Sequence, residues 1–67
     1  MMTEVRELKQ FDKFSFAGSK EIHCISRISN CQFTDKKLDK PVHGKQIRTQ
    51  HGHIYTCYSN ELVNKES

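Results

Sequence analysis

The strict alternation of apolar and polar side chains in residues 13–18 (KFSFAG) constrains the fold more than any other feature. Phe14 and Phe16 alternate with Lys13 and Ser15, which is the period of a β-strand with one face in water. A glycine and a serine follow, and glycine tolerates the positive φ that tight turns require. The segment therefore predicts a strand followed by a turn.

Two more strands are predicted in the C-terminal half. Residues 46–50 place Ile47 and Thr49 on one face, and residues 54–59 are mostly β-branched or aromatic, as strands usually are. His51 and Gly52 lie between the two segments and predict the connecting turn.

Residues 21–33 (EIHCISRISNCQF) are compatible with a helix or a strand. Ile22, Ile25 and Ile28 are spaced by three, as on one face of a helix. The stretch is nevertheless rich in β-branched residues and serine and has neither alanine nor leucine, which favours a strand. We expect a strand with a β-bulge, in which Ile22 and Cys24 face inward and Ile28 does so after one extra residue.

The remaining segments predict connections and chain ends. Residues 34–40 (TDKKLDK) predict an exposed loop that ends before a proline, and Gly44 predicts another turn. Residues 1–9 are expected to be a lead-in, either extended or with a helical turn around Val5 and Leu8 that Thr3 caps. Leu62 and Val63 are expected to tuck under as a final apolar plug, in a short C-terminal turn before a disordered tail at 64–67.

These elements predict one small all-β domain over residues 1–67. The expected architecture is a partly open barrel of four to five short antiparallel strands, because closure satisfies the backbone groups at the edges of a small sheet.

The stretch LKQFDKFSFAG, residues 8–18, resembles the opening of many short phage and bacterial proteins with an SH3-like small barrel. In those proteins a leucine precedes a turn, an Asp-Lys or Asp-Arg pair and a Phe-x-Phe strand. The ending IYTCYSNELV resembles their last strand and terminal turn. Their pattern often has glycine where this chain has Phe11. The resemblance covers both ends of the chain and implies a small non-enzymatic module that binds protein or nucleic acid, without assigning any binding residue.

The cysteine count and the hydropathy predict where in the cell the protein is found. Three cysteines cannot all pair within one chain, and free cysteines are most often small buried side chains in a reducing environment. No apolar run approaches the ~18 residues of a membrane span, and the first ten residues lack the apolar centre of a signal peptide. We therefore expect a cytoplasmic protein that does not contact a membrane.

His51, His53 and Cys57 are candidate zinc ligands, because they lie within seven residues and zinc is bound by histidine and cysteine. Their spacing matches no zinc framework, and the glycine between the histidines predicts a turn with both histidines solvated. We expect no metal and no other cofactor.

Motifs for catalysis are absent from the sequence. It contains no nucleophile elbow, no phosphate-binding glycine loop and no paired-carboxylate motif. We therefore expect a protein that is not an enzyme.

The net charge of +3 is concentrated in one segment. Residues 36–53 hold five basic side chains against one aspartate, a sum of +4, whereas residues 1–35 sum to zero and residues 54–67 to −1. Such a segment is either a solvated loop or a binding surface. The candidate contact residues are Lys36, Lys37, Lys40, Lys45 and Arg48, with Tyr58 as an aromatic anchor.

Two functions fit this surface. The first is a protein-binding module, of the kind that phages use to inhibit or modulate a host protein, whose larger partner presents an acidic surface. The alternative is sequence-independent nucleic-acid binding through the same residues. An unpaired strand edge on so small a core also leaves a homodimer open.

Overall fold

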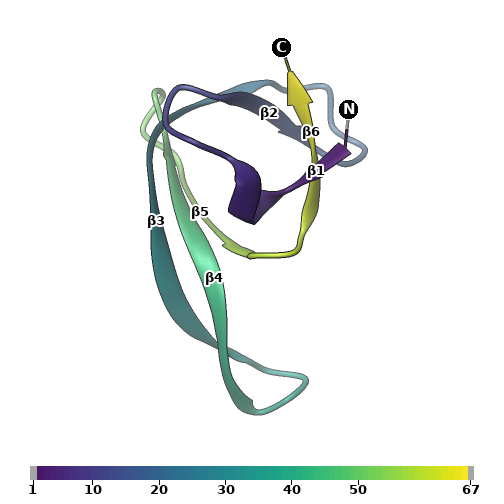
Figure 1. The fold of residues 1–67 in the computed structure, drawn as a ribbon, viewed down its shortest axis with the longest axis vertical. Helices are drawn as coiled ribbons and strands as arrows, with labels where there is room; N and C mark the ends of the chain where they lie inside the picture. Colours follow the sequence, from purple (N-terminus) through teal and green to yellow (C-terminus); the bar gives the residue numbers. More distant parts are fainter. Residues whose placement is uncertain (1, 67) are drawn as a thin grey trace.

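The computed structural model describes residues 2–66, which form one six-stranded antiparallel sheet in the spatial order β1-β6-β2-β3-β4-β5 (Figure 1). The strands are β1 (Met2–Glu4), β2 (Lys13–Phe16), β3 (His23–Asp35), β4 (Lys40–Thr49), β5 (Ile54–Tyr58) and β6 (Leu62–Glu66). A single 3-10 turn, η1 (Val5–Glu7), follows β1. The predicted all-β class is confirmed, with six strands instead of four to five. Within residues 2–66, no helix has the length and apolar character needed to cross a membrane.

The strands predicted from alternation are present as β2, as the second half of β4 and as β5. Phe14, Ile47 and Thr49 are buried, as their pattern predicts, but Ser15, predicted on the water-facing side of its strand, is buried as well, at 4% exposure. The turns predicted at Gly18 and Gly52 are confirmed, because these glycines take φ of +82° and +87°.

Residues 23–35 form the strand β3, so the helical alternative is wrong. The expected bulge is present as a register shift between Ile25 and Arg27. The predicted inward face is wrong before the bulge, since His23 and Ile25 are buried while Ile22 is 52% exposed. His23 pairs directly with the buried Phe14 of β2, and opposed residues of an antiparallel pair share a face.

β3 and β4 form a long hairpin, which corrects the predicted exposed loop at 34–40. Their pairing continues without a break from Arg27 opposite Arg48 to Asp35 opposite Lys40, which leaves only residues 36–39 as the turn. Gly44 lies within β4 and is not a turn residue. A β-carbon on Gly44 would lie 2.3 Å from the carbonyl oxygen of Cys57 and 2.5 Å from Cε1 of Phe33. The glycine is therefore required by close packing between strands.

The predicted lead-in holds an extended start and a helical turn at Val5, as expected, but both chain ends also pair in the sheet, which corrects the predicted disordered tail. Residues 2–4 pair with β6 as strand β1, and the following Val5 and Leu8 are buried in the core. The Thr3 hydroxyl donates to the Glu7 carboxylate at 2.7 Å and caps no helix. Residues 64–66 pair with β2, so they are not a disordered tail; residue 67 lies outside the described residues. In the predicted plug, Val63 is buried but Leu62 is 54% exposed.

The sheet curls around a core of seven buried apolar residues but does not close into a barrel. Among residues 2–66, β1 pairs only with β6 and β5 only with β4, so each leaves one edge without a strand partner. η1 lies against the inside of the curl, where the N–H groups of Val5 and Arg6 donate to the carbonyls of Glu61 and Ser59, each at 2.9 Å. The core side chains are Val5, Leu8, Phe14, Ile25, Ile47, Cys57 and Val63.

Phe11 has a φ of +73° in the turn before β2. This is the position at which the SH3-like phage and bacterial pattern often has glycine, and positive φ is unfavourable for an aromatic residue. The turn is held by backbone contacts with β3, because the Phe11 N–H donates to the Ile25 carbonyl at 2.8 Å and the Asp12 carbonyl accepts from the Ile25 N–H at 2.9 Å.

Candidate functional site

A surface pocket forms where β5 ends before the hairpin beside it. β5 pairs with residues 44–48 of β4, so residues 40–43 of β4 have no strand neighbour on that side. After Tyr58 the chain turns away, with the Glu61 N–H donating to the Tyr58 carbonyl at 3.1 Å. The hollow left between the hairpin and this turn has a volume of about 520 Å³, within the range of sites that hold a ligand or an anchoring side chain.

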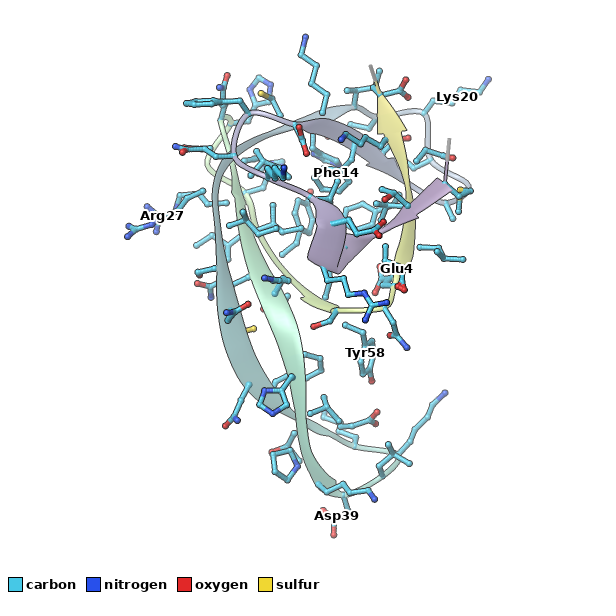
Figure 2. All side chains as sticks on the ribbon, viewed as in Figure 1. Glu4, Phe14, Lys20, Arg27, Asp39 and Tyr58 are labelled. Carbon is cyan, nitrogen blue, oxygen red and sulfur yellow. The ribbon has the colours of Figure 1, made fainter. Side chains whose placement is uncertain are left out.

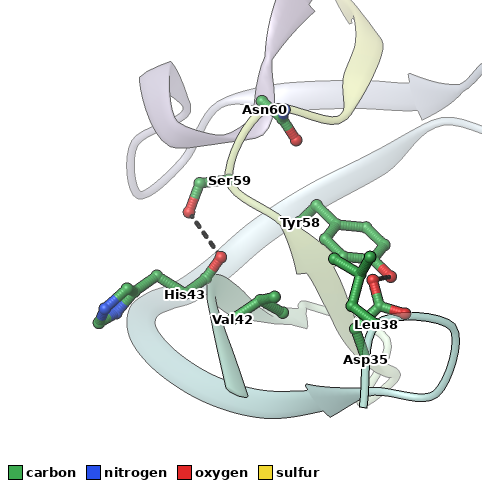
Figure 3. A pocket seen from close by; sticks show the side chains of 7 residues that line it. All are labelled: Asp35, Leu38, Val42, His43, Tyr58, Ser59 and Asn60. Carbon is green, nitrogen blue, oxygen red and sulfur yellow. Dashed lines mark hydrogen bonds between the residues drawn. The ribbon is translucent and has the colours of Figure 1, made fainter. Parts of the chain in front are cut away.

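We call this hollow the tyrosine groove, and Figure 3 shows its lining. The apolar surfaces come from Leu38 in the hairpin turn, Val42 of β4 and the ring of Tyr58. Leu38 is 57% exposed and Tyr58 is 37% exposed, so apolar surface is available to another molecule. The complete lining is Asp35, Leu38, Val42, His43, Tyr58, Ser59 and Asn60.

Tyr58 is held in place on two sides. Its hydroxyl donates to Oδ2 of Asp35 at 2.7 Å, and its ring packs edge-on against Phe33 with centroids 5.1 Å apart. Asp35 also accepts from the backbone N–H of Lys37 at 2.8 Å. The Tyr58 hydroxyl and then the Lys37 N–H lower the pKa of Asp35, while the same hydrogen bond to Asp35, followed by burial, raises the pKa of Tyr58.

The free edge of β4 beside the groove offers little to an added strand. The Ser59 hydroxyl donates to the His43 carbonyl at 3.4 Å, as the dashed line in Figure 3 shows, so the backbone of His43 faces the β5 side. Alternation of backbone direction places Pro41 on the same side, and proline has no N–H to donate. Recognition at this groove therefore depends on inserted side chains more than on backbone pairing.

The basic residues predicted as one stripe are spread over three places. Lys36 and Lys37 lie in the hairpin turn and Lys40 begins β4 beside it. The Lys45 ammonium donates to the Asn30 side chain. Lys45 also lies opposite the buried Cys57, on the core-facing side of β4. Three of the five basic residues thus lie beside the tyrosine groove.

Arg48 lies toward the other end of β4, directly opposite Arg27 of β3. The two arginines, with Ser29 and Gln46, line a small hollow of about 140 Å³. Neither arginine forms an ion pair with any of residues 2–66, and Figure 2 shows Arg27 projecting away from the sheet on the side opposite Tyr58. Like charges directly opposite each other on neighbouring strands are destabilising. Sequence reasoning missed this arginine pair because Arg27 lies outside the basic segment and only the strand register reveals it.

The three candidate zinc ligands are not brought together. His51 and His53 are exposed in the turn, whereas Cys57 is a free, buried core residue. Burial, and then the charge of Glu61, raises the pKa of Cys57 to about 11, which is the reverse of what an activated nucleophile or metal-binding thiolate requires. His53 instead lies close to Glu21, which precedes β3, and to His23, the first residue of β3.

Comparison with protein-family models, with curated proteins and with solved structures finds no match to this chain.

Proposed function

We propose that this protein is a small non-enzymatic protein-binding module whose tyrosine groove receives an apolar side chain from a larger partner. The observation that carries the proposal is the groove itself, an open hollow of about 520 Å³ lined by exposed Leu38 and a fixed Tyr58. Tyrosine is enriched among the residues that dominate binding free energy at protein interfaces. A side chain that is already held in place loses little conformational entropy when the partner binds.

Charge around the groove supports a partner segment with acidic residues next to its apolar anchor. Lys36, Lys37 and Lys40 lie in or directly after the hairpin turn that contributes Leu38 to the groove. Asp35, the acidic residue of the lining, already accepts hydrogen bonds from Tyr58 and from the Lys37 backbone. Attraction to exposed lysines chiefly raises the association rate and falls as salt is added.

The likeness of the chain's two ends to short SH3-like phage and bacterial proteins supports a role as an inhibitor or modulator of a host protein. Cys24, Cys31 and Cys57 are free, which supports action in the reducing cytoplasm. The other binding partner to test is a second copy of this chain, which would pair through the open edge of β5.

The test is affinity capture from a host lysate followed by titration of the purified captured protein against variants. Leu38→Asp and Tyr58→Ser should each weaken binding at least about tenfold, as expected for a central anchor. The matched control, Ile22→Asp, changes a residue of similar exposure (52%, against 57% for Leu38) just before β3, at the end far from the hairpin turn, and should bind as the unchanged protein does. Equal binding by all variants would exclude the groove. Light scattering that shows a dimer sensitive to β5 substitutions would point to self-association.

Sequence-independent nucleic-acid binding is the second candidate, and the arginine pair favours it. Arg27 and Arg48 form no ion pair with an acidic residue among residues 2–66, and two neighbouring guanidinium groups suit a phosphate or another anion. Micromolar binding to mixed oligonucleotides, with an affinity that falls steeply with salt and is lost in Arg27→Gln and Arg48→Gln, would support this candidate. Absence of binding at low salt would exclude it.

A further inference from the structure

Glu21, His23 and His53 converge at the end of the sheet remote from the hairpin turn. One potential ligand atom from each side chain lies within 4.8 Å of the others. They come from three places in the chain: the segment before β3, the first residue of β3 and the turn before β5. The cluster is separate from the tyrosine groove, so it does not depend on the proposed function.

Backbone hydrogen bonds hold the two histidine-bearing segments together. The Gln50 N–H donates to the carbonyl of Cys24, next to His23, at 3.0 Å. The Thr49 N–H donates to the His53 carbonyl at 2.9 Å, and the His53 N–H donates to the Thr49 hydroxyl at 3.2 Å. The turn at Gly52 thus places His53 over the start of β3.

His23 is an unusual core residue because its polar ring is almost fully buried, at 3% exposure. Aromatic rings surround it, with centroid distances of 5.4 Å to Phe14, 5.6 Å to Phe16 and 5.1 Å to Tyr55. Neither ring nitrogen of His23 is a buried atom without a partner, since among residues 2–66 only Oε2 of Glu4 is. One ring nitrogen of His23 lies within 4.8 Å of a ligand atom of Glu21 and of one from His53, where the three could share an ion.

His53 has the support that metal-binding histidines commonly have. Its Nδ1 lies 3.2 Å from the Tyr55 hydroxyl, and when Nδ1–H donates to that oxygen, Nε2 is left with a free lone pair. Such contacts fix the tautomer and the orientation of a ligating ring. Tyr55 packs against His23 as well, so one residue positions both histidines.

We propose that Glu21, His23 and His53 bind a zinc ion or a chemically similar late first-row divalent metal. Two imidazoles and one carboxylate are a ligand set that zinc accepts, with water in the fourth position. Zinc–ligand distances are about 2.0–2.2 Å, so the ligand atoms must draw closer than they lie here. Glu21 and His53 are exposed whereas His23 is buried, so side-chain rotation of the two exposed residues would supply this movement. The ion would join the beginning of β3 to the turn before β5.

Isothermal titration of zinc into the reduced, untagged, full-length protein tests this proposal. We expect one equivalent of zinc to bind. In thermal unfolding, a zinc concentration well above the Kd should raise the Tm by about 4 °C or more. Glu21→Gln and His53→Ala change exposed residues, so they should leave folding intact while weakening zinc binding at least about tenfold. His51→Ala, which removes the exposed histidine two residues away, is the matched control and should bind as the unchanged protein does. Magnesium should not raise the Tm, because it prefers oxygen ligands.

Cobalt substitution provides an independent readout. Cobalt(II) at this site should show visible d–d bands without a thiolate-to-metal charge-transfer band, because no cysteine is among the ligands. A strong thiolate band would place the ion on cysteine and overturn the proposal. Unchanged zinc affinity in both Glu21→Gln and His53→Ala would also overturn it.

Discussion

At the scale of single residues, the side chain that matters most to the proposed function is Tyr58. Its phenol is fixed by Asp35 on one side and by the ring of Phe33 on the other. Tyr58 was predicted from the sequence as an aromatic anchor, and it lines the main groove of the structure. Asp35 was not predicted, because its role depends on a contact across 23 residues that no local pattern reveals.

Ionisation of Tyr58 should report its contact with Asp35. The hydrogen bond raises the pKa of Tyr58, so its contribution to stability is present at lower pH and is lost as pH rises through the raised pKa. For Asp35 the pKa is lowered, so its contribution is present above the ordinary aspartate pKa and is lost as pH falls through the lowered value. The contact should therefore be intact between about pH 4 and pH 10.

Tyrosinate absorbance in a Tyr55→Phe background measures the Tyr58 pKa directly. Asp35→Asn should lower that pKa toward the value of free tyrosine, because it removes the negative charge beside the phenol. Asp39→Asn, in the turn after Asp35, is the matched control and should leave the titration unchanged. A Tyr58 pKa that does not respond to Asp35→Asn would contradict the hydrogen bond.

At the scale of elements, the β3–β4 hairpin determines the molecule's shape and was the feature least visible in the sequence. The core-facing strands were predictable because buried and exposed residues alternate in them, most clearly in the second half of β4. In β2 the buried Ser15 interrupts this alternation. Most residues of the projecting hairpin are partly or fully exposed on both faces, so they carry no apolar alternation. Only Phe33 and Val42, which are cross-strand partners, mark this end of the hairpin as strand, and the charged stretch between them resembles a loop.

Gly44→Ala should destabilise the hairpin. Alanine suits a strand better than glycine by less than about 1 kcal/mol, but its β-carbon would lie 2.3 Å from the Cys57 carbonyl oxygen, and such overpacking costs about 1–3 kcal/mol. The clash with backbone should dominate. Chemical denaturation should show a lower free energy of unfolding for Gly44→Ala and a change within about 0.5 kcal/mol for the exposed Gln46→Ala. A stabilised Gly44→Ala variant would mean that β4 and β5 are not packed as described.

The arginine pair should weaken the sheet that carries it. Replacing Arg27 with threonine removes a like-charge cross-strand contact and should increase the free energy of unfolding by about 0.2–1 kcal/mol at low salt. The gain should shrink at high salt, where the repulsion is screened. Lys13→Thr, on β2 opposite Glu66 of β6, removes an opposite-charge contact instead and should lower the free energy of unfolding at low salt. A gain that is independent of salt would attribute the effect to strand propensity instead of charge.

At the scale of the whole molecule, the curled sheet depends on pairings between distant parts of the chain. Residues 2–4 pair with 62–64, which brings Val5 and Leu8 into the core (Figure 1). Local patterns predicted strands, turns and a bulge but could not reveal these long-range pairings, so residues 1–9 were predicted only as a lead-in and residues 64–67 as a disordered tail. The same limit applies to the proposed metal site, because the spatial grouping of Glu21, His23 and His53 depends on the pairing of β3 with β2 and β4.

We propose that the tyrosine groove is the surface that binds a larger protein. Site-specific photo-crosslinking tests it most directly, with a photoreactive amino acid at position 38, in the groove, or at position 22, just before β3. We expect one partner to crosslink strongly from position 38 in a host lysate and to be competed by unlabelled protein but not by Tyr58→Ser. If that partner crosslinks from position 22 and not from position 38, the tyrosine groove is not its binding surface.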